Sequence, residues 1–179
     1  MENPLSLSSV SGLLPIPVEL SRSIVPLTWP EIVWAYEMGI LGWRGLAECA
    51  KARLDSVLDD KVLMDLAYLT KQDSGSAGDL ARCLADRSGP VNESIAKQKW
   101  MYILLRWLHE HRSEFPNILD IIELIYADFG YPDEIQGLVN WMPASEPVLP
   151  GEPFGTRAER LWREYLEKAG ALLEEEGTA

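Results

Sequence analysis

The chain has 179 residues, 47% of them hydrophobic and 25% charged, which is close to the average composition of a soluble globular protein. It carries 16 Lys and Arg against 28 Asp and Glu, a formal net charge of −12 that disfavours nucleic acid and anionic membranes as partners and favours a basic protein. Two cysteines, Cys49 and Cys83, are too few for a disulfide framework or a four-ligand zinc site, and a chain of this length needs neither to bury a core.

The N-terminal region shows no helical pattern. Its uncharged stretch over residues 3–18 has no preceding Lys or Arg and is interrupted by Pro15 and Pro17, so it matches neither a signal peptide nor a membrane span. The Ser-rich opening SLSSVSG is typical of a mobile terminus. We therefore expect a mobile segment over residues 1–26 and a cytoplasmic protein with reduced thiols.

From Thr28 onward, apolar residues recur at helical spacing. Thr28 and Glu31 match a capping box with Pro30 in the first turn, which predicts a helix starting at Trp29 and ending at Gly39. Further helices are predicted over about 43–57, after Asp60, from Ser76 to about 89, over 92–115, after Asn117 to Gly130, over 132–142, and from a second capping box of Thr156 and Glu159.

The predicted helix over 92–115 is apolar on most of its sides. Trp100, Ile103, Leu104, Trp107 and Leu108 form one stripe and neighbouring residues add a second, which is typical of a central helix. We predict an all-α fold, a single-domain irregular bundle of seven to eight helices over residues 27–175 around this Trp-rich helix. A Pro-rich loop is expected over 143–155, where four prolines and two glycines occur, and a frayed tail over 176–179.

Catalytic motifs are not found. His109 and His111 lie two residues apart on one helix, about 200° around its axis, and so do not converge on one metal ion. No E-x-x-H motif or adjacent His-Asp pair occurs. We expect no catalytic residue, no metal and no cofactor. One enzymatic alternative is a Mg²⁺ site of Asp120, Glu123 and Asp128, although spacings of three and five do not put all three on one helix face.

Charge is distributed unevenly. Residues 113–156 contain no Lys or Arg and eight acids, namely Glu114, Asp120, Glu123, Asp128, Asp133, Glu134, Glu146 and Glu152. Aromatic residues lie among them, and exposed aromatics anchor interfaces while an acidic field speeds encounter with a basic partner. The alternative is that the rings face the core and the acids are merely solvated. The candidate partner-binding residues are Asp120, Glu123, Asp128, Phe129, Tyr131, Asp133, Glu134 and Trp141.

Two segments carry a family resemblance. One is Lys99–Leu105 with Trp107 and Leu108, and the other is Ile125–Phe129 with Tyr131-Pro132, Glu134-Ile135 and Met142-Pro143. Together with Leu27–Trp29 and Gly39–Leu41, they resemble a family of small bacterial proteins of unknown function, often encoded like immunity proteins of contact-dependent and polymorphic toxin systems. The resemblance covers about residues 27–162, and Gly130 stands where such proteins usually have an acid. It implies a binding protein and brings no catalytic residues.

The leading hypothesis is a cytoplasmic, non-enzymatic immunity protein that neutralises a cognate bacterial toxin by occlusion or charge mimicry. A basic toxin domain, such as a nuclease, matches the charge best. The expected partner is therefore a protein, with no nucleic acid and no membrane, and the chain is a monomer or a homodimer. The alternative is a helical scaffold or adaptor, or a homodimeric protein with no toxin partner.

Overall fold

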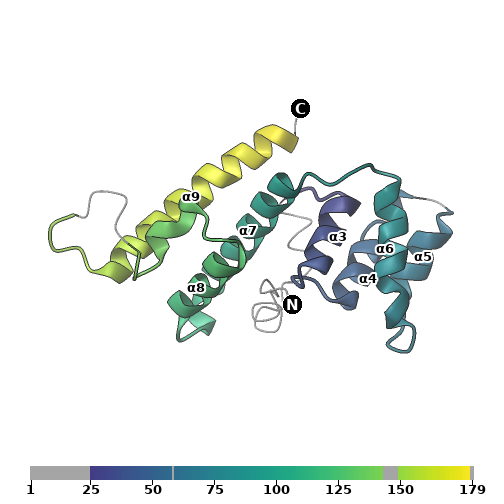
Figure 1. Cartoon of the computed structure of the whole chain (residues 1–179), viewed down its shortest axis with the longest axis horizontal. Helices are drawn as coiled ribbons and strands as arrows, with labels where there is room; N and C mark the ends of the chain where they lie inside the picture. Colours follow the sequence, from purple (N-terminus) through teal and green to yellow (C-terminus); the bar gives the residue numbers. More distant parts are fainter. Residues whose placement is uncertain (1–24, 58, 143–148, 178–179) are drawn as a thin grey trace, which may run out of the picture. The chain divides into compact units, whose positions relative to one another are not determined.

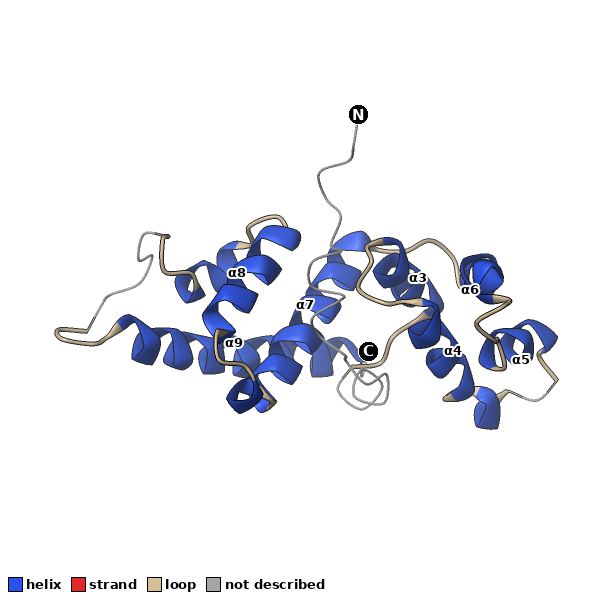
Figure 2. Cartoon of the chain, turned by 90° about the horizontal axis from the view of Figure 1, so that it is seen from below, coloured by secondary structure: helices blue, strands red, loops and turns tan. Residues whose placement is uncertain are grey.

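The computed structural model describes residues 25–57, 59–142 and 149–177. All regular secondary structure in these ranges is helical and none is strand (Figure 2), which confirms the all-α fold class. Of the expected mobile N-terminal segment, residues 1–24 lie outside the described residues, as do 143–148 of the Pro-rich loop and the last two residues of the tail. Val25 is described and is buried, so the packed chain includes residues before the expected boundary at 27.

The chain packs as two compact units, Met1–Trp100 and Met101–Ala179. The boundary falls within α7 (Glu93–Glu110), which contributes residues to both. On α7, every residue from Trp100 to Leu108 except Arg106 is at most 4% exposed. The expectation of a helix that is apolar on most sides is therefore confirmed.

The described part of the first unit, residues 25–57 and 59–100, contains these α-helices before α7 (Figure 1): α3 (Trp29–Glu37), α4 (Trp43–Lys51), α5 (Lys61–Ala67) and α6 (Ala77–Asp86). Short 3₁₀ helices, η1 (Leu54–Ser56) and η2 (Ser74–Ser76), lie between them. α6 packs against α3, α4 and α5, and α4 also packs against α3 and α5. The largest core side chains of this unit are fully buried: Ile32, Leu46, Leu63, Leu66 and Trp100. Each buried aliphatic side chain contributes about 1.5–3 kcal/mol to stability.

The start of α3 confirms the predicted capping box. The Thr28 amide donates to Glu31 Oε2 at 2.7 Å. The other carboxylate oxygen of Glu31 accepts from Lys99 Nζ at 2.7 Å, and the Trp100 indole N–H donates to the Glu31 carbonyl at 2.9 Å. Lys99 also donates to the carbonyl of Pro26 at 3.1 Å. One carboxylate therefore both caps α3 and joins it to the first turns of α7.

The second unit contains the rest of α7, η3 (Arg112–Glu114), α8 (Ile118–Asp128), η4 (Asp133–Leu138) and α9 (Phe154–Gly177). η4 packs against α8 and α9. The approach of α9 is close, because a Cβ atom on Gly137 would lie 2.7 Å from Cδ1 of Leu161. The fully buried residues of this unit form a continuous apolar set: Leu104, Leu105, Leu108, Ile122, Ile125, Tyr126 and Leu138.

Two helix predictions in the second unit are wrong in detail. The predicted helix over 132–142 is the short 3₁₀ helix η4, followed by extended backbone at Val139. The last helix begins at Phe154, so Thr156 lies inside its first turn and is not its cap. The carboxylate of Glu159 instead lies 3.0 Å from Nε2 of His109 on α7. The local motif predicts that Glu159 belongs to a helix cap, but its carboxylate forms a long-range contact with α7 instead.

Candidate partner-binding site

The acidic stretch over residues 113–156 runs from η3 to the start of α9. Four of its acids are exposed, namely Glu114, Asp120, Asp133 and Glu134, while Glu123 and Asp128 are half-buried and Glu146 lies outside the described residues. Glu152 is neutralised locally, because its two carboxylate oxygens accept from Nε and Nη2 of Arg160 at 3.3 and 3.2 Å. These hydrogen bonds hold the pKa of Glu152 below its usual range. The negative charge open to a partner is therefore that of η3, α8 and η4.

The chain turns sharply where α8 ends. Gly130 and Tyr131 both adopt left-handed backbone, with φ of 73° and 60°. The Gly130 amide donates to the carbonyl of Ala127 at 3.0 Å and the Tyr131 amide to that of Tyr126 at 2.8 Å. For a bulky residue such as Tyr131 this conformation costs about 1–3 kcal/mol and persists only where the surroundings fix it. The two hydrogen bonds hold the Tyr131 backbone in that conformation.

Two exposed aromatic rings rest on one buried ring at this turn. Tyr126 is 1% exposed, whereas Tyr131 and Trp141 are each 59% exposed. The Tyr131 ring meets Tyr126 edge to face with 5.3 Å between centroids, and the Trp141 ring lies 6.0 Å from Tyr126 at 63°. Such edge contacts stabilise by about 0.5–1.5 kcal/mol beyond burial. They place Tyr131 and Trp141 on the same part of the surface.

Two carboxylates, Asp133 and Glu134, lie at the start of η4, shortly after Tyr131 in the chain. Burial raises the pKa of the Tyr126 phenol, and the charge of Asp133 raises it further. Burial likewise raises the pKa of Tyr165 on α9, with a further contribution from Glu134. Neither carboxylate forms an ion pair with a Lys or Arg among the described residues. We call Tyr131, Asp133, Glu134 and Trp141 the aromatic–acidic patch.

The structure brings together these four of the eight candidate residues and separates the rest. Asp120 lies in the first turn of α8, about 12 Å along the helix from its C-terminal end, and Glu123 is one turn further on. The prediction that Phe129 contacts a partner is wrong. Phe129 is 3% exposed, and its ring packs into the core, where a binding protein cannot contact it. Asp128 is half-buried beside it.

No group of three His, Cys, Asp or Glu within the described ranges is arranged to hold a metal ion, and this includes the alternative of Asp120, Glu123 and Asp128.

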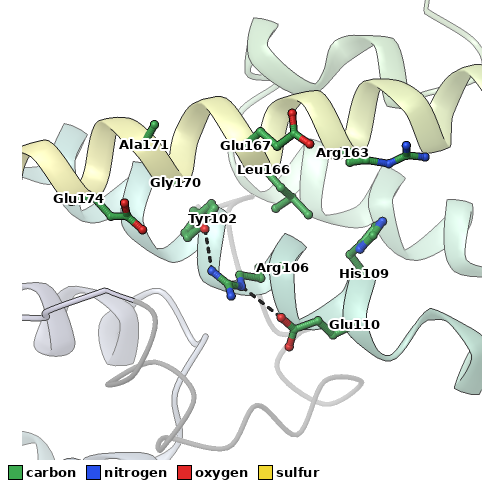
Figure 3. A pocket seen from close by; sticks show the side chains of 10 residues that line it. All are labelled: Tyr102, Arg106, His109, Glu110, Arg163, Leu166, Glu167, Gly170, Ala171 and Glu174. Carbon is green, nitrogen blue, oxygen red and sulfur yellow. Dashed lines mark hydrogen bonds and ion pairs between the residues drawn. The ribbon is translucent and has the colours of Figure 1, made fainter.

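A groove between α7 and α9 escaped the sequence analysis (Figure 3). Its volume is about 470 Å³, and its lining combines charged side chains, such as Arg106 of α7 and Arg163 and Glu167 of α9, with the apolar groups of Leu166 and Ala171. Arg106 donates to Tyr102 Oη at 3.0 Å and to Glu110 at 3.1 Å, and these hydrogen bonds raise its pKa. The groove is wide and open to solvent, with both signs of charge interspersed. No local pattern predicts it, because its two walls are about 60 residues apart in the chain.

The fold and the patch define an all-α protein with exposed aromatics in an acidic surface. Residues 18–170 match the family described as uncharacterized protein conserved in bacteria (DUF2247), and the chain belongs to this family. The expected bacterial family of unknown function is thereby confirmed. Neither a comparison with curated proteins nor one with solved structures gave a match. Among the helices that the structure describes, none is long and apolar enough to cross a membrane.

Proposed function

We propose that this protein acts as an immunity protein, binding a basic bacterial toxin domain in the cytoplasm and neutralising it by occlusion without catalysis. The observation that carries the proposal is the aromatic–acidic patch. Tyr131 and Trp141 are exposed among carboxylates that no Lys or Arg of the described chain neutralises. Surface aromatics of this kind are the usual anchors of protein interfaces, and large exposed apolar side chains grouped together mark interaction sites.

Charge supports a basic partner over a second copy of the chain. The acidic stretch carries no Lys or Arg, so its field attracts a cationic surface and speeds association. A symmetric homodimer built on the patch would place Asp133 and Glu134 of one copy near the same residues of the other. Like charges facing each other across an interface cost several kcal/mol. The patch therefore favours a different, basic protein.

The test begins with a pull-down of the tagged full-length chain from its own source at low and moderate salt. The expected result is one stoichiometric basic protein that is released as salt rises, because exposed charges are screened beyond about 10 Å at 0.1 M salt. The captured protein is then assayed for toxin activity with and without an equimolar amount of the chain. Loss of that activity supports neutralisation, whereas intact activity in the complex refutes it.

A pair of charge-matched variants locates the surface. Asp133→Asn/Glu134→Gln removes two charges from the patch, and Asp65→Asn/Asp86→Asn removes two exposed charges from the first unit. We expect the first variant to slow association by about two- to tenfold and the second to leave it nearly unchanged. Equal effects would show that net charge, and not the patch, determines binding. Recovery of the chain alone, or only as its own dimer, would favour the scaffold alternative.

A further inference from the structure

We infer that the aromatic–acidic patch is a receptor for an arginine side chain presented by the partner, with Tyr131 and Trp141 contacting the guanidinium and Asp133 pairing with it. This inference rests on the proposed function and adds the chemistry that the partner must supply. These three residues come from one short stretch of chain, which begins between α8 and η4 and ends just after η4.

Three partly exposed aromatic rings of this chain carry an arginine of the chain itself: Arg53 lies 5.3 Å from the centroid of Trp29, Arg44 lies 5.4 Å from that of Trp43, and Arg157 lies 5.2 Å from that of Phe154. Tyr68, which is 68% exposed, carries no such arginine among the described residues and stands without an aromatic neighbour of the kind that Tyr131 and Trp141 share. The negative face of an aromatic ring attracts such cations, by about 0.5–1 kcal/mol at exposed sites.

Tyr131 and Trp141 have no such arginine within the part of the chain that the structure describes, and they are more exposed than the three rings that do. Residues 113–156, which surround both rings in the sequence, contain no Lys or Arg. For these two rings the cation is supplied by the partner.

One carboxylate of the patch is unpaired. Asp133 is exposed, follows Tyr131 by two residues at the start of η4, and has no cationic partner among the described residues. Glu152, in the same acidic stretch, is by contrast already held by Arg160. A carboxylate beside exposed aromatic faces fits arginine better than lysine, because a planar guanidinium stacks on a ring and pairs with a carboxylate at the same time.

The two exposed rings are held in place before a partner binds. The Tyr131 backbone is held in left-handed geometry by its hydrogen bond to the carbonyl of Tyr126, and its ring rests on the same residue. Trp141 rests on Tyr126 as well. Little ordering of these rings is then needed on binding, and affinity rises when that cost is low.

The experiment uses the full chain and a small probe. The peptide acetyl-Gly-Arg-Gly-amide is titrated into ¹⁵N-labelled protein while the indole N–H resonances of the seven tryptophans are followed by NMR. Trp141→Phe identifies the resonance of Trp141 by its loss. Peptides with lysine or with citrulline, the uncharged isostere of arginine, replace the arginine peptide in parallel titrations.

We expect a saturable shift of the Trp141 resonance with arginine, a weaker effect with lysine and none with citrulline. Asp133→Asn should weaken the arginine effect by about two- to fivefold, the range for one exposed ion pair. Tyr131→Ala should weaken it as well, with the remaining indole resonances unmoved as proof of folding. Matched changes in the first unit, Asp65→Asn and Tyr68→Ala, should leave it unchanged.

The inference is overturned by a Trp141 resonance that does not move, by an equal response to citrulline, or by equal weakening from the variants in the first unit. Because the titration needs no toxin, its failure is separate from failure of the proposed function. If the titration is positive but the captured partner keeps its toxin activity, the arginine-binding inference stands and the proposed neutralisation is refuted. A neutralised toxin whose binding is unchanged by Asp133→Asn and Trp141→Ala refutes the receptor and retains neutralisation.

Discussion

Glu31→Ala is expected to be among the most destabilising single substitutions in the first unit. The carboxylate is buried and accepts from the Thr28 amide and from Lys99 Nζ, both at 2.7 Å. After its removal Lys99 keeps the hydrogen bond to the neutral carbonyl of Pro26 but loses the carboxylate that balances its charge. The side chains of Glu31 and Lys99 are only 9% and 13% exposed, so the ammonium would lose its partner in a largely desolvated position.

The magnitude follows from these contacts. Removing one partner of a buried ion pair costs about 3–5 kcal/mol, because the remaining charge is uncompensated. Loss of a helix cap alone costs about 1 kcal/mol. Domains are stable by only about 5–15 kcal/mol, so this single change removes a large share of the free energy of unfolding. The matched control is Glu48→Ala, which breaks an i,i+3 pair with Lys51 whose side chains are about half exposed, and should cost at most about 0.5 kcal/mol.

Urea unfolding followed by far-UV circular dichroism measures both variants. Lys99→Met in the Glu31→Ala background removes the stranded charge and should recover at least about 1 kcal/mol, since contacting residues couple by about 0.5–3 kcal/mol. A loss below about 1 kcal/mol for Glu31→Ala, equal to that of Glu48→Ala, would refute the assignment of a buried ion pair that joins α3 to α7.

Three further predictions test other parts of the structure. Burial alone would raise the pKa of Asp60, the N-cap of α5, but hydrogen bonds from two amides and an arginine lower it below its usual 3.8. Asp60→Asn should therefore be less stable than the unsubstituted chain at pH 7. This difference in the free energy of unfolding should vanish as the pH falls below 3.8 through the folded-state pKa of Asp60. A difference that persists at pH 2 in urea unfolding would contradict this prediction. Cys49 is buried and burial raises its pKa to about 11, whereas Cys83 is exposed, so a thiol reagent at pH 8 should modify one thiol in the native protein and two in denaturant. Gly137→Ala should cost at most about 1 kcal/mol, because its Cβ would lie 2.7 Å from the terminal Cδ1 of Leu161 on α9, a half-buried side chain that has to turn aside. Gly155→Ala, with nothing within 4 Å, should instead stabilise by about 0.4–1 kcal/mol; a higher melting temperature for Gly137→Ala than for Gly155→Ala would refute this packing.

The features that the sequence alone determined are those set by neighbours along the chain. Spacing predicted the helical class, and the apolar pattern around Trp100 and Leu108 predicted that α7 is buried on most sides, because a helix repeats every 3.6 residues regardless of its context. The capping box at Thr28 was predicted for the same reason, since its two partners are three residues apart. The acidic stretch was likewise predicted from composition alone.

The tertiary structure decided which side chains reach the surface and which charges are cancelled. Phe129, Tyr131 and Trp141 are all aromatic residues of the acidic stretch, yet the first is buried and the other two are exposed. The left-handed turn at Gly130 and Tyr131 separates the buried Phe129 from the exposed Tyr131. Contacts between residues far apart in the sequence decide other features. The carboxylate of Glu159, which the sequence predicts as part of a helix cap, lies beside His109, 50 positions away along the chain. Local spacing carries no information on such pairs, because they form only when separate helices pack.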